Sequence, residues 1–529
     1  MKHQYLSLAL MSVILFFLTS CRHSPKPPAA MTENGNAKEY LFAETEYAGK
    51  WLANYNSLQN KIRTELASNA LAPTPGQAAG IGTIIQAADK WKILVKNGKE
   101  VHAVSDAGGK TIDKIIYTEA DAAFKVSLKA SVSKTYIFIK SSSDQSAEIR
   151  VFPYSCKNLE PVLMQERKAG VIYSAEHFGG NNIWILSNDN APMRTILIAP
   201  DRDPVSKRWK AAVKENDSLF IADFTLVDLK YLVLVQRRNL STSIQITGIF
   251  EKNDKDAPVE NVINFPEPEG RITGLVYDSK DDKLVFTYSS IITPPTCYTY
   301  GLHSMHLGIR WKKQIKNYIQ DDYKAEVVWA GSKDKVRVPV STLRKRETDN
   351  QGQARPLLLF IDTDDLQCSE SCFSPDLLSF LDRGFCIARL HFPSTGLKNN
   401  EGPDLVSATL SSLTEKKLAQ TGLVTLLGKG NAALIALNTF TAHPAWIRTL
   451  VLETPSYGEN LATMPAPDTY IIADPGDQDK GLASLKLASE MRKHIKTENT
   501  LLVRNVPVQD QDFKSGLVTF ILISNGIQK

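Results

Sequence analysis

The spacing of apolar residues divides the chain into parts with different periods. Between residues 41 and 71, large apolar side chains recur every three or four positions, which is the period of an amphipathic helix. From residue 81 onward, short apolar runs are bounded by Gly, Asp, Asn and Ser, and this pattern predicts an all-β domain. Beyond Pro356, apolar runs alternate with helical segments such as 432–441 and 481–496. This alternation predicts an α/β domain.

The β-rich part repeats along the chain. Its core runs begin at Tyr136, Ile183, Tyr231 and Leu284, at intervals of 183 − 136 = 47, 231 − 183 = 48 and 284 − 231 = 53 residues. A period of about 45 to 50 residues is typical of four-stranded propeller blades, and about 250 residues at this period predict about five blades. A β-sandwich with long insertions is the alternative, because the repeat is one of pattern and not of identity.

The α/β part contains apolar runs of the length expected for a parallel sheet that is buried on both faces. They are 357–361, 384–388, 422–427, 449–452, 470–473 and 501–506. The chain has 529 residues, which is enough for two large domains. Its net charge of +5 is spread along the sequence without a block of Lys and Arg, so we expect no nucleic-acid partner.

The N-terminus has the features of a bacterial lipoprotein signal peptide. Residues 1–20 combine a basic start, an apolar run and the sequence Leu18-Thr19-Ser20 before Cys21. We expect Cys21 to become the lipidated N-terminus, with an uncleaved anchor as the alternative. Residues 21–38 are rich in Pro, Ala and Asn, which is typical of a flexible tether. These features predict a membrane-anchored protein of the cell envelope, on the periplasmic or the surface side.

Several segments resemble a known peptidase family. They are Tyr117-Thr-Glu-Ala-Asp-Ala-Ala-Phe-Lys-Val-Ser-Leu, Tyr288-Ser-Ser-Ile-Ile-Thr-Pro-Pro-Thr, Glu148-Ile-Arg-Val, and the stretches 40–66, 356–360, 380–385 and 426–455. Together they resemble the oligopeptidase B branch of the prolyl oligopeptidase family. The resemblance implies a β-propeller followed by an α/β-hydrolase domain, and a Ser-Asp-His triad that hydrolyses short peptides.

We therefore divide the chain into a signal peptide, a tether, an N-terminal helix, a propeller-like domain and a degenerate hydrolase domain. Their predicted bounds are 1–20, 21–38, 39–80, 81–345 and 346–529.

The resemblance locates the turn that carries the catalytic serine in this family, a Gly-x-Ser-x-Gly elbow between a strand and a helix. The corresponding segment here is Leu427-Gly-Lys-Gly-Asn-Ala-Ala, which puts Gly430 at the nucleophile position. Glycine has no side chain and therefore no atom that can attack a carbonyl carbon.

The other two members of the triad are also replaced. The resemblance puts Gln478 at the position of the catalytic aspartate, although a slip of one residue would bring Asp477 or Asp479 there. Gln509 or Gln511 stands where the catalytic histidine is expected, and the chain contains no histidine after residue 494. Without an imidazole, no group at this position accepts a proton at neutral pH in the way the mechanism requires.

The oxyanion donor is lost as well. Asp362 stands where the family has a donating tyrosine, and a carboxylate repels the negative charge that develops in the transition state. The acidic segment that gives oligopeptidase B its preference for Arg and Lys is absent between Tyr457 and Thr469. These losses predict a pseudoenzyme with a binding or scaffolding role, a peptide or protein partner and no cofactor.

An active serine-type oligopeptidase that cleaves short peptides is the alternative. Its nucleophile would be Ser456 with His443, or Ser304 with His303 and His306, although these residues lie in ordinary turns. A poorly folding remnant is a third possibility, against which the clean apolar pattern of both domains speaks.

Acidic residues follow three of the predicted parallel strands and would share one edge of the sheet. They are Asp362, Asp364, Asp365, Asp474, Asp477, Asp479, Asp510 and Asp512. Hard cations such as Ca²⁺ bind to oxygens on acidic loops, so a cation site at this edge is one hypothesis. Solvated turn aspartates that point apart are the alternative.

Overall fold

The computed structural model forms two compact units. It describes residues 25–31, 36–70, 84–87, 91–107, 110–143, 145–249, 261–331, 337–347, 355–362, 373–392, 401–455, 466–473, 478–496, 498–505 and 510–528. The first unit contains Met1–Leu71, Ser290–Pro294 and Lys313–Lys529, and the second contains Ala72–Ser289 and Pro295–Lys312. None of the helices in the described part of the chain is both long and apolar enough to cross a membrane.

The first unit contains an eight-stranded sheet with the order β21-β22-β24-β23-β25-β26-β27-β28. The strands are β21 (Tyr323–Gly331), β22 (Arg337–Lys345), β23 (Leu357–Asp362), β24 (Cys386–His391), β25 (Val424–Lys429), β26 (Ile447–Glu453), β27 (Asp468–Ile472) and β28 (Leu501–Arg504). Strands β23 to β28 pair in parallel, so the predicted α/β domain is confirmed.

The assignment of residues up to 345 to the propeller is wrong. Strands β21 and β22 pair with each other, and β22 pairs antiparallel with β24, so both extend the parallel sheet. Val338 and Val340 are buried in the same apolar cluster as Leu359. The alternating pattern of these strands suits a half-buried strand in either domain, so the pattern alone did not decide between them.

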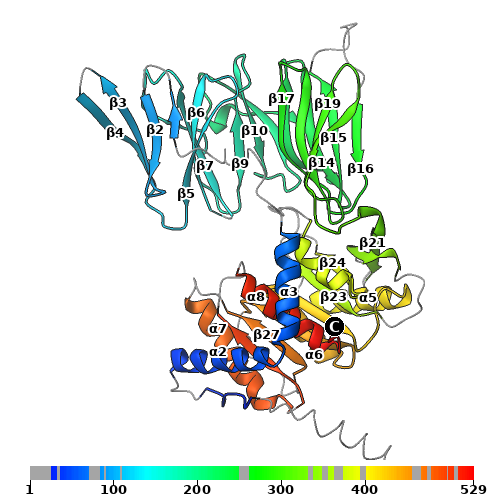
Figure 1. Ribbon diagram of the computed structural model, residues 1–529. Coiled ribbons are helices and arrows are strands. Elements are labelled where there is room, and N and C mark those ends of the chain that lie inside the picture. Colours follow the sequence, from blue (N-terminus) through cyan, green and yellow to red (C-terminus); the bar gives the residue numbers. More distant parts are fainter. Residues whose placement is uncertain are drawn as a thin grey trace, which may run out of the picture. The chain divides into compact units, whose positions relative to one another are not determined.

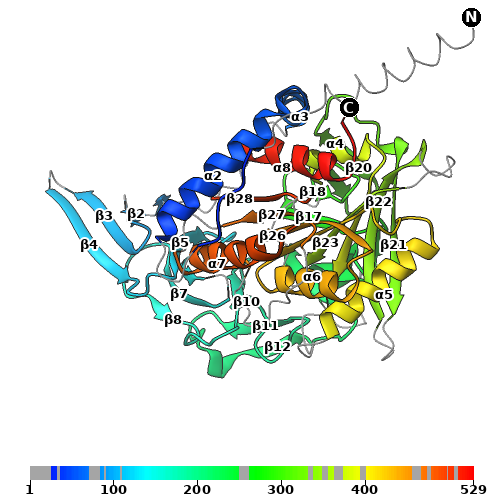
Figure 2. The same cartoon turned by 90° about the horizontal axis from the view of Figure 1, so that it is seen from below.

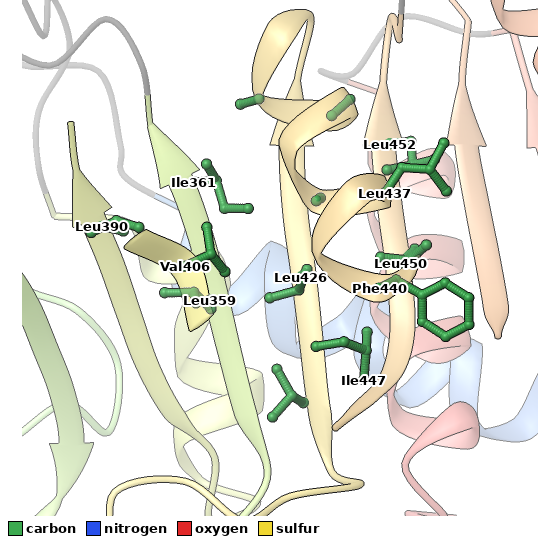
Figure 3. Close-up of a cluster of buried hydrophobic side chains, with 14 of the residues drawn as sticks. Leu359, Ile361, Leu390, Val406, Leu426, Leu437, Phe440, Ile447, Leu450 and Leu452 are labelled. Carbon is green, nitrogen blue, oxygen red and sulfur yellow. The ribbon is translucent and has the colours of Figure 1, made fainter. Parts of the chain in front are cut away.

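Helices cover both faces of this sheet. They are α2 (Ala37–Ala53), α3 (Asn56–Asn69), α4 (Leu378–Leu381), α5 (Glu401–Glu415), α6 (Asn431–Ala442), α7 (Gln478–His494) and α8 (Gln511–Ser524). Figure 2 shows α6 and α7 on one side of β26 and β27, and α8 on the other. Because strand side chains alternate between faces, Leu359 and Ile361 pack with α5 and α6 (Figure 3), whereas Leu358 packs in the cluster that contains α8.

The N-terminal segment forms two helices and not the one that we predicted. The chain breaks at Asn54 and Tyr55, where the Tyr55 N–H donates to the Leu52 carbonyl at 2.8 Å. Helix α2 packs against β28 and α7, and α3 packs against α8 (Figure 1). The apolar period continues through the break because both helices bury their apolar side against the same unit.

A buried ion pair attaches α2 to this unit. The Arg492 Nε and Nη2 atoms lie 3.0 and 2.6 Å from the two carboxylate oxygens of Glu44, and Nη2 also donates to the Leu501 carbonyl at 2.7 Å. The guanidinium lies 4.9 Å from the centre of the Tyr47 ring. Burial and the Glu44 charge raise the pKa of Tyr40 far above its usual range, so this hydroxyl stays neutral.

The described residues of the second unit form five four-stranded antiparallel sheets. The first two contain β1 (Ile84–Gln86), β2 (Trp91–Lys96), β3 (Glu100–Ala107), β4 (Lys110–Thr118), β5 (Lys125–Ala130), β6 (Tyr136–Ser142), β7 (Ala147–Pro153) and β8 (Val162–Leu163). The third and fourth contain β9 (Tyr173–Glu176), β10 (Asn182–Ser187), β11 (Thr195–Pro200), β12 (Lys210–Val213), β13 (Phe220–Val227), β14 (Tyr231–Arg238), β15 (Ser241–Gly248) and β16 (Asn261–Phe265). The fifth contains β17 (Arg271–Asp278), β18 (Lys283–Ser289), β19 (Thr296–Gly301) and β20 (Leu307–Lys312). The expected propeller-like architecture is confirmed, and the four core runs of the sequence repeat are the second strands β6, β10, β14 and β18.

Buried apolar clusters join neighbouring sheets of this unit. Ile93 packs in one cluster with Ile137, Phe138 with Ile183, Leu186 with Leu232, and Ile246 with Phe286. Each cluster joins one sheet to the next, and Figure 1 shows the first sheet, with β3 and β4, at one end of the row. Among the described residues, no such cluster joins the fifth sheet to the first.

Candidate active-site region

The carboxyl ends of the parallel strands carry charged or titratable residues. Asp362 and His391 end the paired strands β23 and β24, and Lys429 and Glu453 end β25 and β26. His391 is buried, and its Nε2 lies 2.9 Å from the Ser341 hydroxyl on β22. Ligands of open α/β sheets bind at this edge, so it is the candidate active-site region.

The turn from β25 into α6 has the shape of a nucleophile elbow. Gly430, the N-cap residue directly before α6, has φ 55° and ψ −119°, a conformation that favours glycine. Its N–H donates to the Glu453 carbonyl at 2.9 Å, which fixes the turn against the next strand. A Cβ atom built at Gly430 would meet nothing within 4 Å. The turn therefore has room for a nucleophile but carries no side chain at this position.

Gly428 is required by packing and not by chemistry. A Cβ atom at this residue would lie 2.3 Å from the Ala432 carbonyl oxygen and 2.6 Å from the Ala433 nitrogen. Strand β25 and helix α6 therefore approach each other too closely for any side chain at this position. This close approach keeps the elbow in shape whether or not the site catalyses a reaction.

Two further features lie beside the turn. The Lys429 ammonium lies 2.7 Å from the Glu453 carboxylate, but the lysine side chain is 73% exposed, so this pair contributes little stability. Thr454, directly after β26, has a φ of 43°. A β-branched residue is strained in the left-handed region, and such strain tends to occur at functional sites.

The predicted triad positions lie at the start of helices or outside the described residues. Gln478 is the first residue of α7, and Gln511 is the exposed first residue of α8. Gln509 lies outside the described residues. In these segments the structure therefore gives backbone positions but no side-chain geometry for a triad.

The structure gives two of the acidic residues other roles. The Asp510 side chain caps α8 and accepts from the N–H groups of Asp512 and Phe513 at 2.6 and 3.1 Å. Asp512 lies 2.7 Å from Arg63 of α3. Helix capping and an ion pair thus explain both residues without a cation.

The rest of the cation hypothesis is not tested. Asp364, Asp365, Asp474 and Asp477 lie outside the described residues, as do Cys21 and the side chain of Asp362. In the part of the chain that the structure describes, no group of three His, Cys, Asp or Glu residues is placed to hold a metal ion. The cation site stays a prediction.

The alternative serine and histidine sets are not assembled in the described regions. The Ser304 hydroxyl accepts from the His306 backbone N–H at 3.4 Å, whereas the His303 imidazole lies 2.6 Å from Asp282. The His443 ring stacks on Trp446 at the end of α6, with 4.8 Å between ring centres. Ser456 lies outside the described residues.

A serine–histidine pair that the sequence did not suggest lies in the second unit. The Ser133 hydroxyl lies 2.6 Å from His177 Nδ1, and His177 Nε2 lies 3.3 Å from the Gly180 carbonyl. Because a carbonyl only accepts, Nε2 carries the proton and Nδ1 accepts from the serine. Ser133 also accepts from the Thr135 N–H at 3.2 Å, so the pair links the turn between β5 and β6 of one sheet to the turn between β9 and β10 of the next.

Comparison with known proteins finds similarity to prolyl oligopeptidases. The family model for the prolyl oligopeptidase N-terminal β-propeller domain matches residues 107–310. A protein of Moraxella lacunata named Protease 2 is 26% identical over 278 residues, which are 51% of this chain and 38% of that protein. A Prolyl endopeptidase-like protein of Xenopus laevis is 26% identical over 261 residues, which are 49% of this chain and 35% of that protein. These matches span well under two thirds of the relatives' own lengths.

Solved structures share the fold at low sequence identity. Oligopeptidase B from Leishmania major superposes with a TM-score of 0.73 at 14% identity, over 93% of this chain and 92% of that chain. Oligopeptidase B from Trypanosoma brucei, with covalently bound antipain, gives 0.71 at 14% identity, over 96% of this chain and 97% of that chain.

Proposed function

We propose that this chain is a member of the prolyl oligopeptidase family that has lost catalysis and that it binds a peptide or protein at the cell envelope. The observation that supports this proposal best is Gly430, which occupies an elbow-shaped turn between β25 and α6. The turn keeps the geometry that presents a nucleophile in α/β-hydrolases, but it presents none.

The chemistry of acyl transfer explains why this one position matters. The reaction needs an attacking atom, a group that takes its proton and donors that stabilise the oxyanion. Gly430 provides no attacking atom, and the sequence has no histidine after residue 494 to take the proton. A carboxylate at Asp362 repels the oxyanion instead of donating a hydrogen bond to it. Repairing one position therefore leaves the other two requirements unmet.

Labelling with a fluorophosphonate probe tests this proposal. We expect the mature protein to take no label and to hydrolyse neither Arg-directed nor Pro-directed peptides. Gly430→Ser should restore no turnover, although the space around Gly430 admits the side chain, because effects of groups that act as a unit are not additive. A labelled serine, whose label disappears on mutation to alanine, would refute the proposal.

An active serine-type oligopeptidase is the second candidate, and one observation favours it. His177 is oriented to accept a proton from Ser133, as a general base does in covalent catalysis. Ser133→Ala is therefore the first variant to compare if the wild-type protein is labelled. Loss of the label in this variant would support the second candidate.

Attachment to the envelope through Cys21 is a further part of the proposal. Acyl chains contribute about 0.8 kcal/mol for each buried CH₂ group, so two or three chains hold a protein firmly to a membrane. The partner is then a peptide or protein that reaches the same membrane surface, and no nucleic acid or cofactor is required.

A further inference from the structure

Cationic side chains from three neighbouring sheets of the second unit lie where the second strand of each sheet connects to the third. Lys140 lies near the end of β6, Arg237 near the end of β14, and Arg194 in the turn between β10 and β11. All three therefore lie near the connection between the second and third strands of their sheets. The Arg194 and Arg237 guanidinium carbons lie 4.6 and 5.8 Å from the centre of the Phe220 ring. We call Lys140, Arg194, Arg237 and Phe220 the basic cluster.

Burial and neighbouring cations lower the pKa values of two members of the basic cluster, Lys140 and Arg194. Burial lowers the pKa of Lys140, and the charges of Arg194 and Lys129 lower it further. Burial and the charge of Arg237 likewise lower the pKa of Arg194. Like charges that are partly removed from water repel one another, so an anion at this place is stabilised by the protein.

One carboxylate faces these cations. Asp223 acts on Arg194, but burial raises the pKa of Asp223 itself, against the Phe224 N–H that donates to it at 2.8 Å. The nearby Glu176 is already paired, since one of its oxygens lies 2.7 Å from Lys129 and the other accepts two backbone N–H groups. Among the described residues, Asp223 is therefore the one carboxylate that acts on Arg194, and the charges that act on Lys140 are those of Arg194 and Lys129.

The backbone at this place is irregular in two independent ways. Arg194 has a φ of 68°, in the left-handed region that few side chains adopt. The pairing of β13 with β14 shifts register between Ile221 and Asp223, which is a bulge that redirects the Asp223 side chain. The Arg194 Nη1 donates to the Ala222 carbonyl at 3.3 Å, so the strained residue is held against the bulge. Strained residues and bulges occur preferentially beside binding sites.

We propose that the basic cluster binds carboxylate groups of an acidic peptide. A guanidinium group binds a carboxylate through two parallel hydrogen bonds, and the Lys140 ammonium adds a point charge. The Phe220 ring gives the two arginines a flat apolar surface on which to pack. This proposal names a ligand class for the binding role proposed above and rests on that role. It does not involve Gly430 or the candidate active-site region.

A binding experiment with the full mature chain tests the site. Triglutamate is the probe, sodium phosphate tests for a small inorganic anion, and trilysine is the charge control, all at one ionic strength. We expect triglutamate to raise the melting midpoint and to bind measurably by calorimetry. Arg194→Gln should weaken binding about tenfold or more, because it removes a charge-assisted hydrogen bond. Arg238→Gln is the matched control, since Arg238 is exposed and adjacent in sequence to Arg237.

A second variant guards against a folding defect. Lys140→Met removes a charge that its neighbours repel, so the ligand-free variant should melt at or above the wild-type midpoint and yet lose triglutamate binding. Equal binding by wild type and Arg194→Gln, or no binding of triglutamate by the wild type, would overturn the proposal. Binding of phosphate alone would overturn the assignment to an acidic peptide. A labelled serine together with triglutamate binding at Arg194 would refute the loss of catalysis and leave this site standing.

Discussion

The ion pair between Glu44 and Arg492 predicts a large loss of stability when one partner alone is replaced. The Glu44 side chain is 0% exposed and that of Arg492 is 3% exposed, so neither charge is solvated by bulk water. Arg492→Met leaves the Glu44 carboxylate buried without its partner. Breaking a buried ion pair in this way costs about 3 to 5 kcal/mol.

Replacing both partners should cost less than replacing one. The double variant Glu44→Met with Arg492→Met removes both charges, and apolar residues of similar volume can replace a buried pair with little loss. We therefore expect a coupling energy of at least about 2 kcal/mol in the double-mutant cycle. The lost bond from Arg492 to the Leu501 carbonyl accounts for about 1 kcal/mol of the cost that remains.

Urea unfolding followed by circular dichroism measures these differences, and hydrogen exchange in α2 locates them. Lys493→Met is the matched control, because its side chain is 46% exposed and pairs with Glu490 on the surface, so it should cost less than about 0.5 kcal/mol. The reasoning is wrong if Arg492→Met lies within about 1 kcal/mol of the wild type, or if the double variant costs the sum of the single variants.

Three further predictions concern other parts of the chain. Burial disfavours the Glu119 carboxylate, but hydrogen bonds from Ser141, the Asp121 N–H and Arg167 outweigh it and lower its pKa from 4.5 to about 2. It therefore contributes about 3 kcal/mol above pH 4.5 that is lost as the pH falls toward 2. Acid titration of stability should flatten in Glu119→Gln but not in the control Glu166→Gln. Thr454→Asn should raise the free energy of unfolding by about 1 kcal/mol, measured in urea, because asparagine tolerates a positive φ. Cys21→Ser should move the protein from the membrane to the soluble fraction, and identical fractionation would contradict lipidation.

The sequence predicted the fold where local pattern and burial agree. Strands β23 and β25 are apolar along their length because both faces of a parallel sheet are covered, and such runs are visible without a structure. The assignment of β22 to the wrong domain has a physical reason. An antiparallel strand can have the same run of apolar and polar residues in a propeller and in a mixed sheet, and only the pairing of β22 with β24 distinguishes the two.

The candidate site was predictable only where its residues are close in sequence. The position of Gly430 follows from a strand, a short Gly-containing turn and a helix within one segment. By contrast, the basic cluster joins residues from three sheets, and the pair of Ser133 and His177 joins turns that are 44 residues apart. No periodicity relates such residues, because the packing of one sheet on the next brings them together.

The arrangement of the sheets in a row determines the order in which the second unit unfolds. In a closed ring every blade touches two neighbours, whereas among the described residues of this row each end sheet contributes to a single apolar cluster, as Ile93 does at one end and Phe286 at the other. Stability in such an array is a sum of nearest-neighbour interfaces, as in repeat proteins. Unfolding therefore starts at the ends and proceeds inward, and the third sheet, which is farthest from both ends, exchanges its amide hydrogens last.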